Sequence, residues 1–435
     1  MNSFNSLEAL PSGEWNSNIW PPFTQVPLSE PPERISKASG ALLFRDNKPP
    51  LIDAISSWWV TLHGHANPDI ASAISSQANQ LEQIIFADFI HPPAEELAKR
   101  LSYATRLQRL FFSDNGSTAV EVAIKIACQY WHNKGDSRSQ IIGFEGAYHG
   151  DTFGAMAVGE RNLFNQPFEK MLFPVKRAPW PATWWDDESV EQREEDALLT
   201  LEKLLKTPTL AVILEPLVQG AGGMRMVRPD FLKKAAELVK QGNSLLIADE
   251  VMTGFGRCGD LFASQRADIA PDLMALSKGL TGGFLPMGIT MASESIFQTF
   301  MDKKPEATFW HGHSFTANPL GCAAANASLN LLENNPKNYK EFEARHIKHL
   351  KELTKHSRVE KPRVMGTIAA FDIKTNESKG YLNHAGKQLK QYAVQKGVFI
   401  RPLGNVVYLL PPLCITNEQL EKCYKTIENG LNDLF

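Results

Sequence analysis

The sequence predicts an α/β protein with a mostly parallel β-sheet and a second, smaller α+β part. Between about residues 70 and 330, short apolar runs alternate with helix-like stretches. This alternation is typical of a parallel sheet whose crossover helices cover both faces. Over the last hundred residues, one long charged amphipathic stretch precedes several short apolar runs, and that pattern favours an α+β lobe.

The composition is that of an ordinary globular protein, and it argues against several classes of function. With 435 residues, 43% of them hydrophobic and 21% charged, the chain can bury a large core and form more than one lobe. A net charge of −3 and a pI near 6.4 argue against nucleic acid or a membrane surface as a partner. No apolar run is long enough to span a membrane, and the N-terminus lacks a secretory signal pattern. We therefore expect a cytoplasmic protein whose five widely spaced cysteines are free thiols, with no metal site.

The individual elements follow from local patterns. The first fifty residues are rich in Pro, Ser and Asn, so we expect an irregular arm there. We expect domain limits of 1–65 for the arm and part of the small domain, 66–330 for the large domain and 331–435 for the C-terminal small domain. Helices are predicted for residues 71–84, 93–105 and 338–356. Strands are predicted for the apolar runs at 109–114, 140–145, 210–216, 244–250, 272–278, 368–374, 397–402 and 406–412.

Two of the predicted strands end in charged residues that suit a carbonyl-handling cofactor. The run SLLIA leads into Asp249, and the run DLMALS leads into Lys278. Ligands bind at the carboxyl ends of strands in open parallel sheets, so both side chains are candidates for chemistry. A desolvated lysine is a good nucleophile towards a carbonyl, and an aspartate keeps a pyridine nitrogen protonated. A lone Asp or Lys at a strand end is, however, more often a cap or a surface group.

A phosphate site is predicted where the segment SDNGST (residues 113–118) opens a helical pattern. The free amides of a helix N-terminus favour an anion, Gly116 allows close approach of the backbone, and Ser117 adds a hydroxyl. The alternative is a plain capping loop. A second glycine cluster, GAGGMR (residues 220–225), lacks the third glycine of a dinucleotide fingerprint, so we discount that function.

Aromatic residues near these segments have two possible roles. Tyr148 follows the strand at 140–145 and could stack on a flat cofactor ring, or it could simply pack in the core. Trp58 and Trp59 are adjacent, so on a strand they point to opposite faces and at most one faces a given pocket. The sequence leaves two roles equally open for this pair, packing in the core and forming a wall of the substrate site.

Four motifs together resemble the class III aminotransferases of fold type I. They are VILEP (residues 212–216), ADEVMTGFGR (248–257), LSKGLTGG (276–283) and HGHSFTANPLG (311–321). Their order and spacing are matched along nearly the whole chain, about residues 16 to 432. The resemblance implies a large domain with a mostly parallel seven-stranded sheet and a smaller α+β domain. Glu215 and Arg257 occupy recurrent family positions without a role that the sequence can assign.

The resemblance also implies a cofactor and the residues that hold it. Pyridoxal 5'-phosphate would be bound covalently by Lys278, with Asp249 on its ring nitrogen and Tyr148 over its ring. Gly116 and Ser117 would bind the phosphate. Ser314 from a neighbouring subunit would join them, so the family implies a homodimer with shared active sites.

Three further stretches resemble the family members that aminate 8-amino-7-oxononanoate in biotin biosynthesis. They are NIWPPFT (residues 18–24), ISSWW (55–59) and RPLGNVVYLLPP (401–412). This resemblance implies S-adenosylmethionine as amino donor. It also implies a substrate site of Trp58, Trp59, Tyr148, Gly312 and Arg401, with Arg401 on the terminal carboxylate.

The sequence departs from that pattern at two positions, and the first of them, Phe23, leaves the donor open. Phe23 stands where the family usually has a tyrosine hydroxyl, and His313 stands where many of these members have proline. Lysine is the alternative donor. The rival functions are another class III aminotransferase or aminomutase acting on ω-amino acids, and a silent protein that only binds the cofactor.

Overall fold

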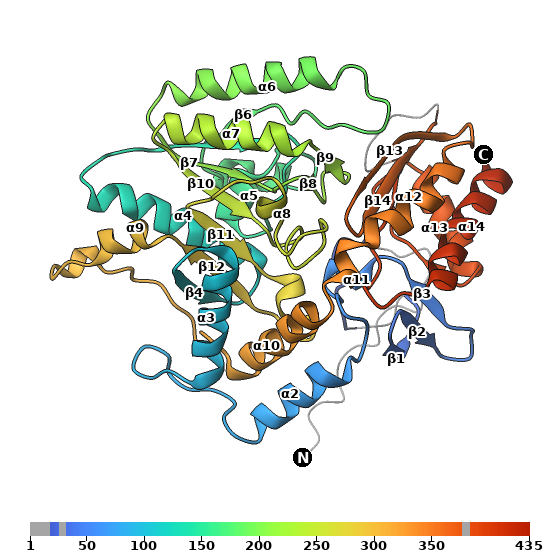
Figure 1. The fold of residues 1–435 in the computed structure, drawn as a ribbon, viewed down its shortest axis with the longest axis horizontal. Helices are drawn as coiled ribbons and strands as arrows, with labels where there is room; N and C mark the ends of the chain where they lie inside the picture. The colour runs from blue at the N-terminus through green and yellow to red at the C-terminus, as the bar shows by residue number, and fades with distance from the viewer. Residues whose placement is uncertain (1–17, 26–31, 376–382) are drawn as a thin grey trace.

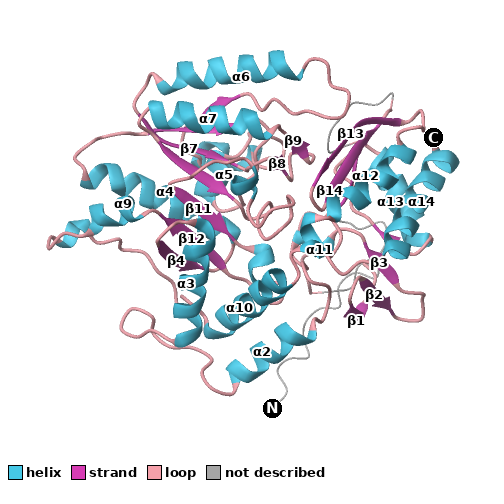
Figure 2. Cartoon of the chain, in the orientation of Figure 1, coloured by secondary structure: helices cyan, strands magenta, loops and turns pink. Residues whose placement is uncertain are grey.

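A computed structural model of the chain describes residues 18–25, 32–375 and 383–435. Figure 1 shows a large sheet covered by helices, with a smaller α+β part beside it that contains the C-terminus. Figure 2 shows helices on the outside of both parts. The longer helices are α2 (Pro68–Ala78), α3 (Pro92–Thr105), α4 (Gly116–Asn133), α6 (Val190–Leu205), α7 (Pro229–Gln241), α10 (Pro319–Asn334), α12 (Phe342–Leu353), α13 (Ala385–Gln395) and α14 (Asn417–Leu434).

The large sheet has seven strands in the order β4-β12-β11-β10-β7-β5-β6. Strand β12 runs antiparallel to both of its neighbours, and the other neighbouring pairs are parallel. The prediction of a mostly parallel seven-stranded sheet is therefore confirmed. The strands are β4 (Arg109–Ser113), β5 (Gln140–Phe144), β6 (Lys176–Ala178), β7 (Thr209–Leu214), β10 (Leu245–Asp249), β11 (Leu273–Leu276) and β12 (Gly288–Ala292).

Helices cover both faces of this sheet, because successive strand residues are apolar on both sides. On one face, Ile213 and Ile247 are buried with Ala123 of α4. On the other face, Val212 and Leu246 are buried among residues of α6 and α7. A continuous apolar run on a strand therefore corresponds to burial on both faces, as expected for a parallel sheet.

The smaller part combines C-terminal and N-terminal segments. Its sheets are β13-β14-β16 and β1-β2-β3-β15, and in the second sheet β3 pairs in parallel with β15. Because this pairing joins the N-terminal strands to the C-terminal part, we propose the domain limits 1–65, 66–330 and 331–435. The strands are β1 (Ile35–Ser39), β2 (Leu42–Arg45), β3 (Leu51–Asp53), β13 (Val359–Met365), β14 (Ile368–Ile373), β15 (Val398–Phe399) and β16 (Val406–Leu409).

Some local predictions were wrong. The arm is not irregular throughout, because residues 35–39 and 42–45 form a hairpin whose side chains are mostly exposed or half-buried. The helix predicted for 71–84 ends at Ala78, and the helix predicted for 338–356 is split into α11 (Lys337–Lys340) and α12. Strands β6 and β12 were missed, since KRA carries no apolar run and GITMA is short and begins with glycine.

Short elements connect these parts, and several lie at the functional site. They are α1 (Ser56–Trp59), α5 (Phe153–Val158), α8 (Ala263–Arg266), α9 (Glu294–Phe297), the two-stranded β8 (Val218–Gln219) and β9 (Arg225–Met226), and the 3₁₀ turns η1 (Gln166–Met171), η2 (Lys278–Thr281), η3 (Gln298–Phe300) and η4 (Pro305–Ala307).

Candidate active site

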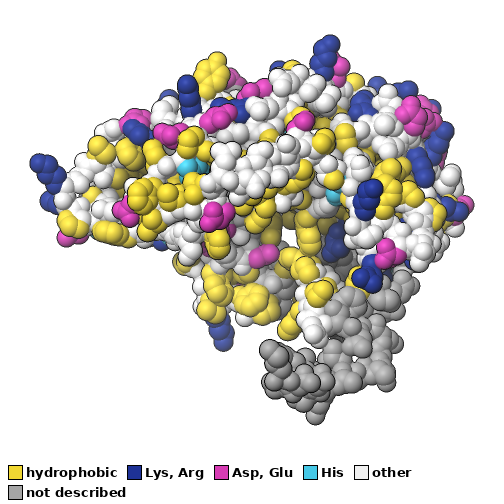
Figure 3. Space-filling model, turned by 90° about the horizontal axis from the view of Figure 1, so that it is seen from below, with side chains coloured by type: hydrophobic (Ala, Val, Ile, Leu, Met, Phe, Trp, Pro, Cys, Tyr) yellow, Lys and Arg dark blue, Asp and Glu magenta, His cyan; other side chains and the backbone are white. Residues whose placement is uncertain are grey.

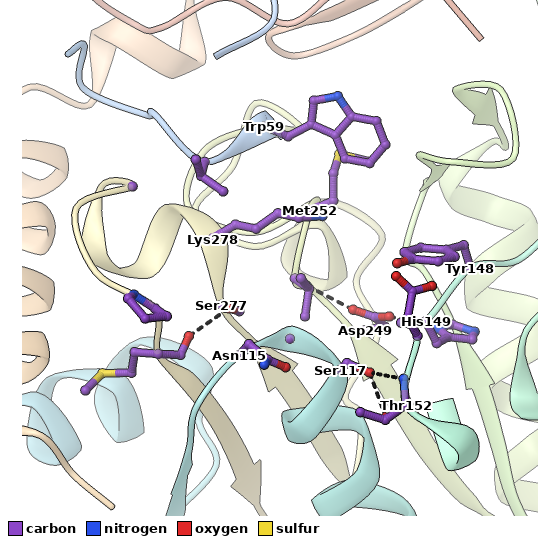
Figure 4. A pocket seen from close by; sticks show the side chains of 18 of the residues that line it. Trp59, Asn115, Ser117, Tyr148, His149, Thr152, Asp249, Met252, Ser277 and Lys278 are labelled. Carbon is purple, nitrogen blue, oxygen red and sulfur yellow. Dashed lines mark hydrogen bonds and ion pairs between the residues drawn. The ribbon is translucent and has the colours of Figure 1, made fainter. Parts of the chain in front are cut away.

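A cavity of about 680 Å³ lies at the edge of the large sheet where the parallel strands end. Its walls come from the loops after β4, β5, β7, β10 and β11. Figure 4 shows Lys278 extending towards Met252 beneath Trp59, with Asp249 and Tyr148 across the cavity. The remaining lining residues that matter here are Asn115, Gly116, Ser117, His149, Gly150, Thr152, Glu215 and Ser277.

Lys278 begins the turn η2, two residues after β11 ends. Its backbone has a positive φ of 47°, an uncommon conformation for a residue with a side chain. Its Nζ lies 4.7 Å from the centre of the Trp59 ring. Burial lowers the pKa of Lys278 from 10.5 to about 8, although the charges of Asp249 and Glu215 oppose this shift. A lysine with that pKa can both lose and regain a proton near neutral pH.

Asp249 is the last residue of β10, and two donors hold its carboxylate. The backbone N of Val251 donates to Oδ1 at 3.1 Å, and Nδ1 of His149 lies 2.7 Å from Oδ2. Both side chains are buried. The carboxylate is thus fixed in one orientation at the edge of the cavity.

The N-terminus of α4 forms a cradle that suits a phosphate group. Asn115 caps this helix, and the Ser117 hydroxyl lies 2.7 Å from Oγ1 of Thr152. A Cβ on Gly116 would lie 2.6 Å from Cγ1 of Val251, and a Cβ on Gly150 would lie 2.3 Å from Oγ of Ser117. Only glycine fits at both positions, because the backbone packs closely against Val251 and Ser117 there. These residues fit a phosphorylated pyridine whose ring nitrogen faces Asp249.

A second hydrogen-bond network fastens this cradle to the loop that carries Tyr148. Glu121 of α4 accepts hydrogen bonds from the Thr152 hydroxyl at 2.6 Å and from the backbone N of Gly154 at 2.6 Å. The backbone N of Thr152 donates to Oγ of Ser117 at 3.0 Å. The phosphate cradle and the start of α5 are therefore held in fixed register.

Tyr148 lines the cavity with 38% of its surface exposed, and Glu215 lies beside it. Burial first, and then the charges of Asp151, Asp249 and Glu215, raise the pKa of the Tyr148 hydroxyl, so it stays protonated. Glu215 accepts hydrogen bonds from the backbone N of Tyr148 at 3.1 Å and of Gly220 at 3.0 Å. Burial raises the pKa of Glu215 to about 7.

The two adjacent tryptophans separate, because the chain turns where they lie. Residues 56–59, the element α1, form a tight turn with non-helical backbone angles and not a strand, and φ is positive at Ser56, Ser57 and Trp59. Trp59 is 6% exposed, lines the cavity and donates from Nε1 to the Tyr408 hydroxyl at 3.0 Å. Trp58 is 44% exposed and does not line the cavity.

Trp58 instead lies beside two other residues that were linked to the substrates, Arg401 and Phe23. The Arg401 guanidinium lies 5.1 Å from the centre of the Trp58 ring, and the Phe23 ring centre lies 5.5 Å from it. Arg401 and Phe23 lie outside the lining of the cavity. These three side chains therefore form a separate cluster.

Gly312 and Ser314 are not brought to this chain's own cavity. Both are exposed, and the Ser314 carbonyl accepts a hydrogen bond from Nε2 of Gln83 at 2.8 Å. The segment is anchored on α4, where Lys125 lies 2.9 Å from Nδ1 of His311 and Gln129 donates to the Ala307 carbonyl.

Sequence reasoning missed the roles of several residues. It assigned no role at the site to His149, Glu121, Thr152 or Met252. Strand-end position could have indicated Glu215, which directly follows β7, but no local pattern indicates which loop side chain reaches Asp249. Arg257 is fully buried, and one of its guanidinium nitrogens donates to the Pro411 carbonyl at 3.0 Å.

Two features of the described residues bear on other functions. Within residues 18–25, 32–375 and 383–435, the His, Cys, Asp and Glu side chains form no group of three that could hold a metal ion. Among the helices of the described chain, none has the length and apolar character needed to cross a membrane.

Comparison with known proteins agrees with the motifs. Residues 26–431 match the family described as aminotransferase class-III. An adenosylmethionine-8-amino-7-oxononanoate aminotransferase of Synechococcus elongatus is 54% identical, over 96% of this chain and 99% of that protein. A protein of the same name from Geobacter sulfurreducens is 37% identical, over 96% and 97% of the two chains.

Solved structures agree with the fold. An adenosylmethionine-8-amino-7-oxononanoate aminotransferase of Methanocaldococcus jannaschii superposes with a TM-score of 0.89 at 31% identity, over 96% of this chain and 97% of that one. An amine transaminase from an uncultivated Pseudomonas species, solved with PLP bound, gives 0.92 at 27% identity, over 97% and 100%. The fold type I architecture predicted from the motifs is confirmed, and the chain is an aminotransferase that belongs to the class III family.

Proposed function

We propose that this aminotransferase uses pyridoxal 5'-phosphate, held covalently by Lys278, to convert 8-amino-7-oxononanoate to 7,8-diaminononanoate in biotin biosynthesis. We propose S-adenosylmethionine as the amino donor. The observation that carries the proposal is the placement of Lys278 and Asp249 on one cavity, with the N-terminus of α4 beside them. The names of the relatives support the substrate and the donor.

Each residue at the cavity has a role that its position supports. The bound cofactor supplies an electron-withdrawing ring next to the carbon whose proton is removed. Lys278, with a pKa of about 8, removes that proton and returns one during each half of the reaction. Asp249 would pair with the ring nitrogen of the bound cofactor, Tyr148 would pack on its ring, and Gly116 and Ser117 would bind its phosphate.

The outer cluster supports a substrate with an acyl chain and a terminal carboxylate. Arg401 presents a planar guanidinium that can pair with a carboxylate in two hydrogen bonds. Trp58 supplies an apolar wall at the cluster, and Trp59 supplies one at the cavity. The same cluster would also accept other ω-carboxylates, so a different class III aminotransferase or aminomutase is the alternative.

We propose a homodimer in which Gly312 and Ser314 complete the partner's cavity. Both residues are exposed, and large apolar side chains near them in sequence, Trp310 and Phe315, are 76% and 63% exposed. Figure 3 shows hydrophobic side chains over much of the face seen from below. Large exposed apolar side chains of this kind are common at interfaces between subunits. Sedimentation should give twice the chain mass; an active monomer would contradict the shared site.

We also propose a cytoplasmic location. All five cysteines are unpaired, and proteins of the cytoplasm generally keep their thiols reduced. A redox-sensitive disulfide in the protein isolated from cells would contradict this.

The test of the proposed function is the absorption spectrum of the purified protein during addition of single substrates. S-adenosylmethionine alone should remove the band of the lysine-bound cofactor and produce the pyridoxamine phosphate band. Adding 8-amino-7-oxononanoate should then restore the first band. A response to lysine alone would change the donor, and a response only to ω-amino acids would remove the biotin assignment.

A further inference from the structure

Asp53, the last residue of β3, is a fully buried carboxylate that accepts three hydrogen bonds. Its Oδ1 accepts one from the backbone N of Ile55 at 3.1 Å, and its Oδ2 accepts one from the backbone N of Ser57 at 2.7 Å. Nε2 of His65 lies 2.8 Å from Oδ2, and because a carboxylate only accepts, the hydrogen of this contact lies on Nε2. Donors on both oxygens offset the cost of burying the charge.

The turn that follows Asp53 has a backbone conformation that serine disfavours. Ser57 has a φ of 58° and a ψ of −112°, close to the first central position of a type II′ turn, which usually holds glycine. The φ values of Ser56 and Trp59 are positive as well. Residues with a side chain persist in such regions only where surrounding contacts fix the backbone. At Ser57, the Asp53 carboxylate supplies that contact.

This turn decides where two neighbouring aromatic side chains lie. Trp59 enters the cavity, where the centre of its ring lies 4.7 Å from Nζ of Lys278 (Figure 4). Trp58 lies at the outer cluster, where the centre of its ring lies 5.1 Å from the Arg401 guanidinium. A change in the turn would therefore displace walls at both ends of the proposed substrate site.

We propose that Asp53 is a positioning residue, which holds the turn at residues 56–59 and so places Trp58 and Trp59 as walls for the keto substrate. The role rests on the proposed function, because 8-amino-7-oxononanoate is the molecule that these walls would contact. Asp53 does not line the cavity, so it acts through the backbone of Ile55 and Ser57. His65 holds the carboxylate in the orientation that faces both backbone donors.

A competing role for Asp53 is to balance the charge of Arg257. Arg257 is fully buried, and burial lowers its pKa to about 9, while the charge of Asp53 opposes that shift. If this were the main role, loss of Asp53 would destabilise the fold without displacing the turn. The two roles differ in whether glycine at position 57 repairs the loss, because glycine adopts this backbone conformation without help.

The first test is the steady-state kinetics of the holoenzyme with 8-amino-7-oxononanoate. Asp53→Asn keeps the size of the side chain, but in either orientation its amide nitrogen faces one of the two backbone donors. This variant should raise KM for the keto substrate about tenfold, because apolar contact with the walls is lost, and leave kcat within about twofold. Adding Ser57→Gly to this variant should restore most of KM.

A matched control separates relief of the turn from general stabilisation. Arg106 also has a positive φ, 62°, at the exposed end of α3, and it does not line the cavity. Arg106→Gly should add stability to Asp53→Asn without lowering its raised KM. If Asp53→Asn fails to fold, His65→Ala, which removes only one of the three donors, should give a smaller rise in KM.

A second measurement needs no substrate. The cofactor-loaded protein would be labelled with 5-fluorotryptophan, and the fluorine NMR signals of Trp58 and Trp59 would be assigned by single substitution to phenylalanine. Asp53→Asn should shift both signals, and adding Ser57→Gly should return them towards their wild-type positions. The signals of the other tryptophans should not move.

Three outcomes would overturn the proposal. Asp53→Asn could lower kcat with KM unchanged, which is the result of partial unfolding or of a lost counter-charge. It could leave KM and the two tryptophan signals unchanged, or Ser57→Gly could restore no more than Arg106→Gly does. A wild-type protein that does not respond to 8-amino-7-oxononanoate would instead overturn the proposed function, and the tryptophan signals would still test the turn.

Discussion

The inner and outer ends of the site differ in how firmly the chain fixes their geometry. At the inner end, Lys278 and Asp249 lie at or just beyond the ends of neighbouring strands, and hydrogen bonds of 2.7–3.1 Å fix Asp249. At the outer end, Phe23, Trp58 and Arg401 come from segments far apart in the sequence and meet through contacts of 5.1–5.5 Å between their ring or guanidinium groups. The rigid end suits the chemistry shared by a family, and the loosely built end suits the choice of substrate.

The largest expected effect is at the inner end. Lys278→Ala should lower kcat by about 10⁴-fold or more, because the nucleophile and the proton carrier are both removed. The cofactor should still bind, since the phosphate cradle and Asp249 remain. Turnover and the absorption spectrum of the variant would be measured together. Full activity in this variant would contradict the assignment of Lys278 as the nucleophile and proton carrier.

In the protein without bound cofactor, the buried Lys278 should lower the free energy of unfolding. Its folded pKa of about 8 lies below 10.5, so the unfolded chain binds a proton that the folded chain gives up between these pH values. The cost is present in full below about pH 8 and disappears above about pH 10.5. Allowing for water in the cavity, the cost is roughly 2 kcal/mol.

Lys278→Met should therefore be more stable than the wild type at pH 7. The two proteins should converge as the pH rises towards 10.5, because the wild-type lysine is then neutral in both states. Urea unfolding of both proteins at each pH gives the difference, in which other titrating groups cancel. A stability difference that is zero at pH 7, or one that grows with pH, would contradict the lowered pKa.

At the outer end, substitution of Arg401 should affect the keto substrate selectively. Arg401→Ala should lower kcat/KM for 8-amino-7-oxononanoate about 100-fold, because the carboxylate loses a paired donor. Arg401→Lys keeps the charge but not the planar pair of donors, so about a tenfold loss is expected. The half-reaction with the amino donor is the internal control and should change little. Equal losses in both half-reactions would place Arg401 in a general structural role.

The two ends also differ in how far the sequence could predict them. Lys278 and Asp249 were predictable because apolar runs identify strands, and strand ends meet at one edge of a parallel sheet. The contact of His149 with Asp249 depends on the path of a loop, which no periodicity describes. The tryptophans at 58 and 59 were considered as neighbours on a strand, but positive φ values at Ser57 and Trp59 turn the chain there.

Long-range placement was the other limit. The contact between Trp58 and Arg401 joins the beginning and the end of the chain, and it is formed only when β3 pairs with β15. The motif match assigned both residues to a substrate site, but it could not show that they lie outside the cavity. Gly312 and Ser314 do not line the cavity of this chain. The motifs could therefore name the outer residues of the site, but they could not show where those residues lie.

The smallest expected effect concerns the amino donor. Phe23 packs on Trp58 and on Phe164, with ring centres 5.5 and 6.3 Å apart, so its ring is held by apolar contacts. Phe23→Tyr should leave stability within about 0.5 kcal/mol of the wild type, since Phe23 is half exposed and keeps its ring. A hydroxyl at this position should raise the rate of the half-reaction with S-adenosylmethionine about threefold, which corresponds to a fraction of the free energy of one exposed hydrogen bond.

Rapid-mixing spectra with S-adenosylmethionine and with lysine would measure the rates for both donors. An equal change for both would remove Phe23 from donor selection, whereas a gain confined to S-adenosylmethionine would place the choice of donor at the outer end.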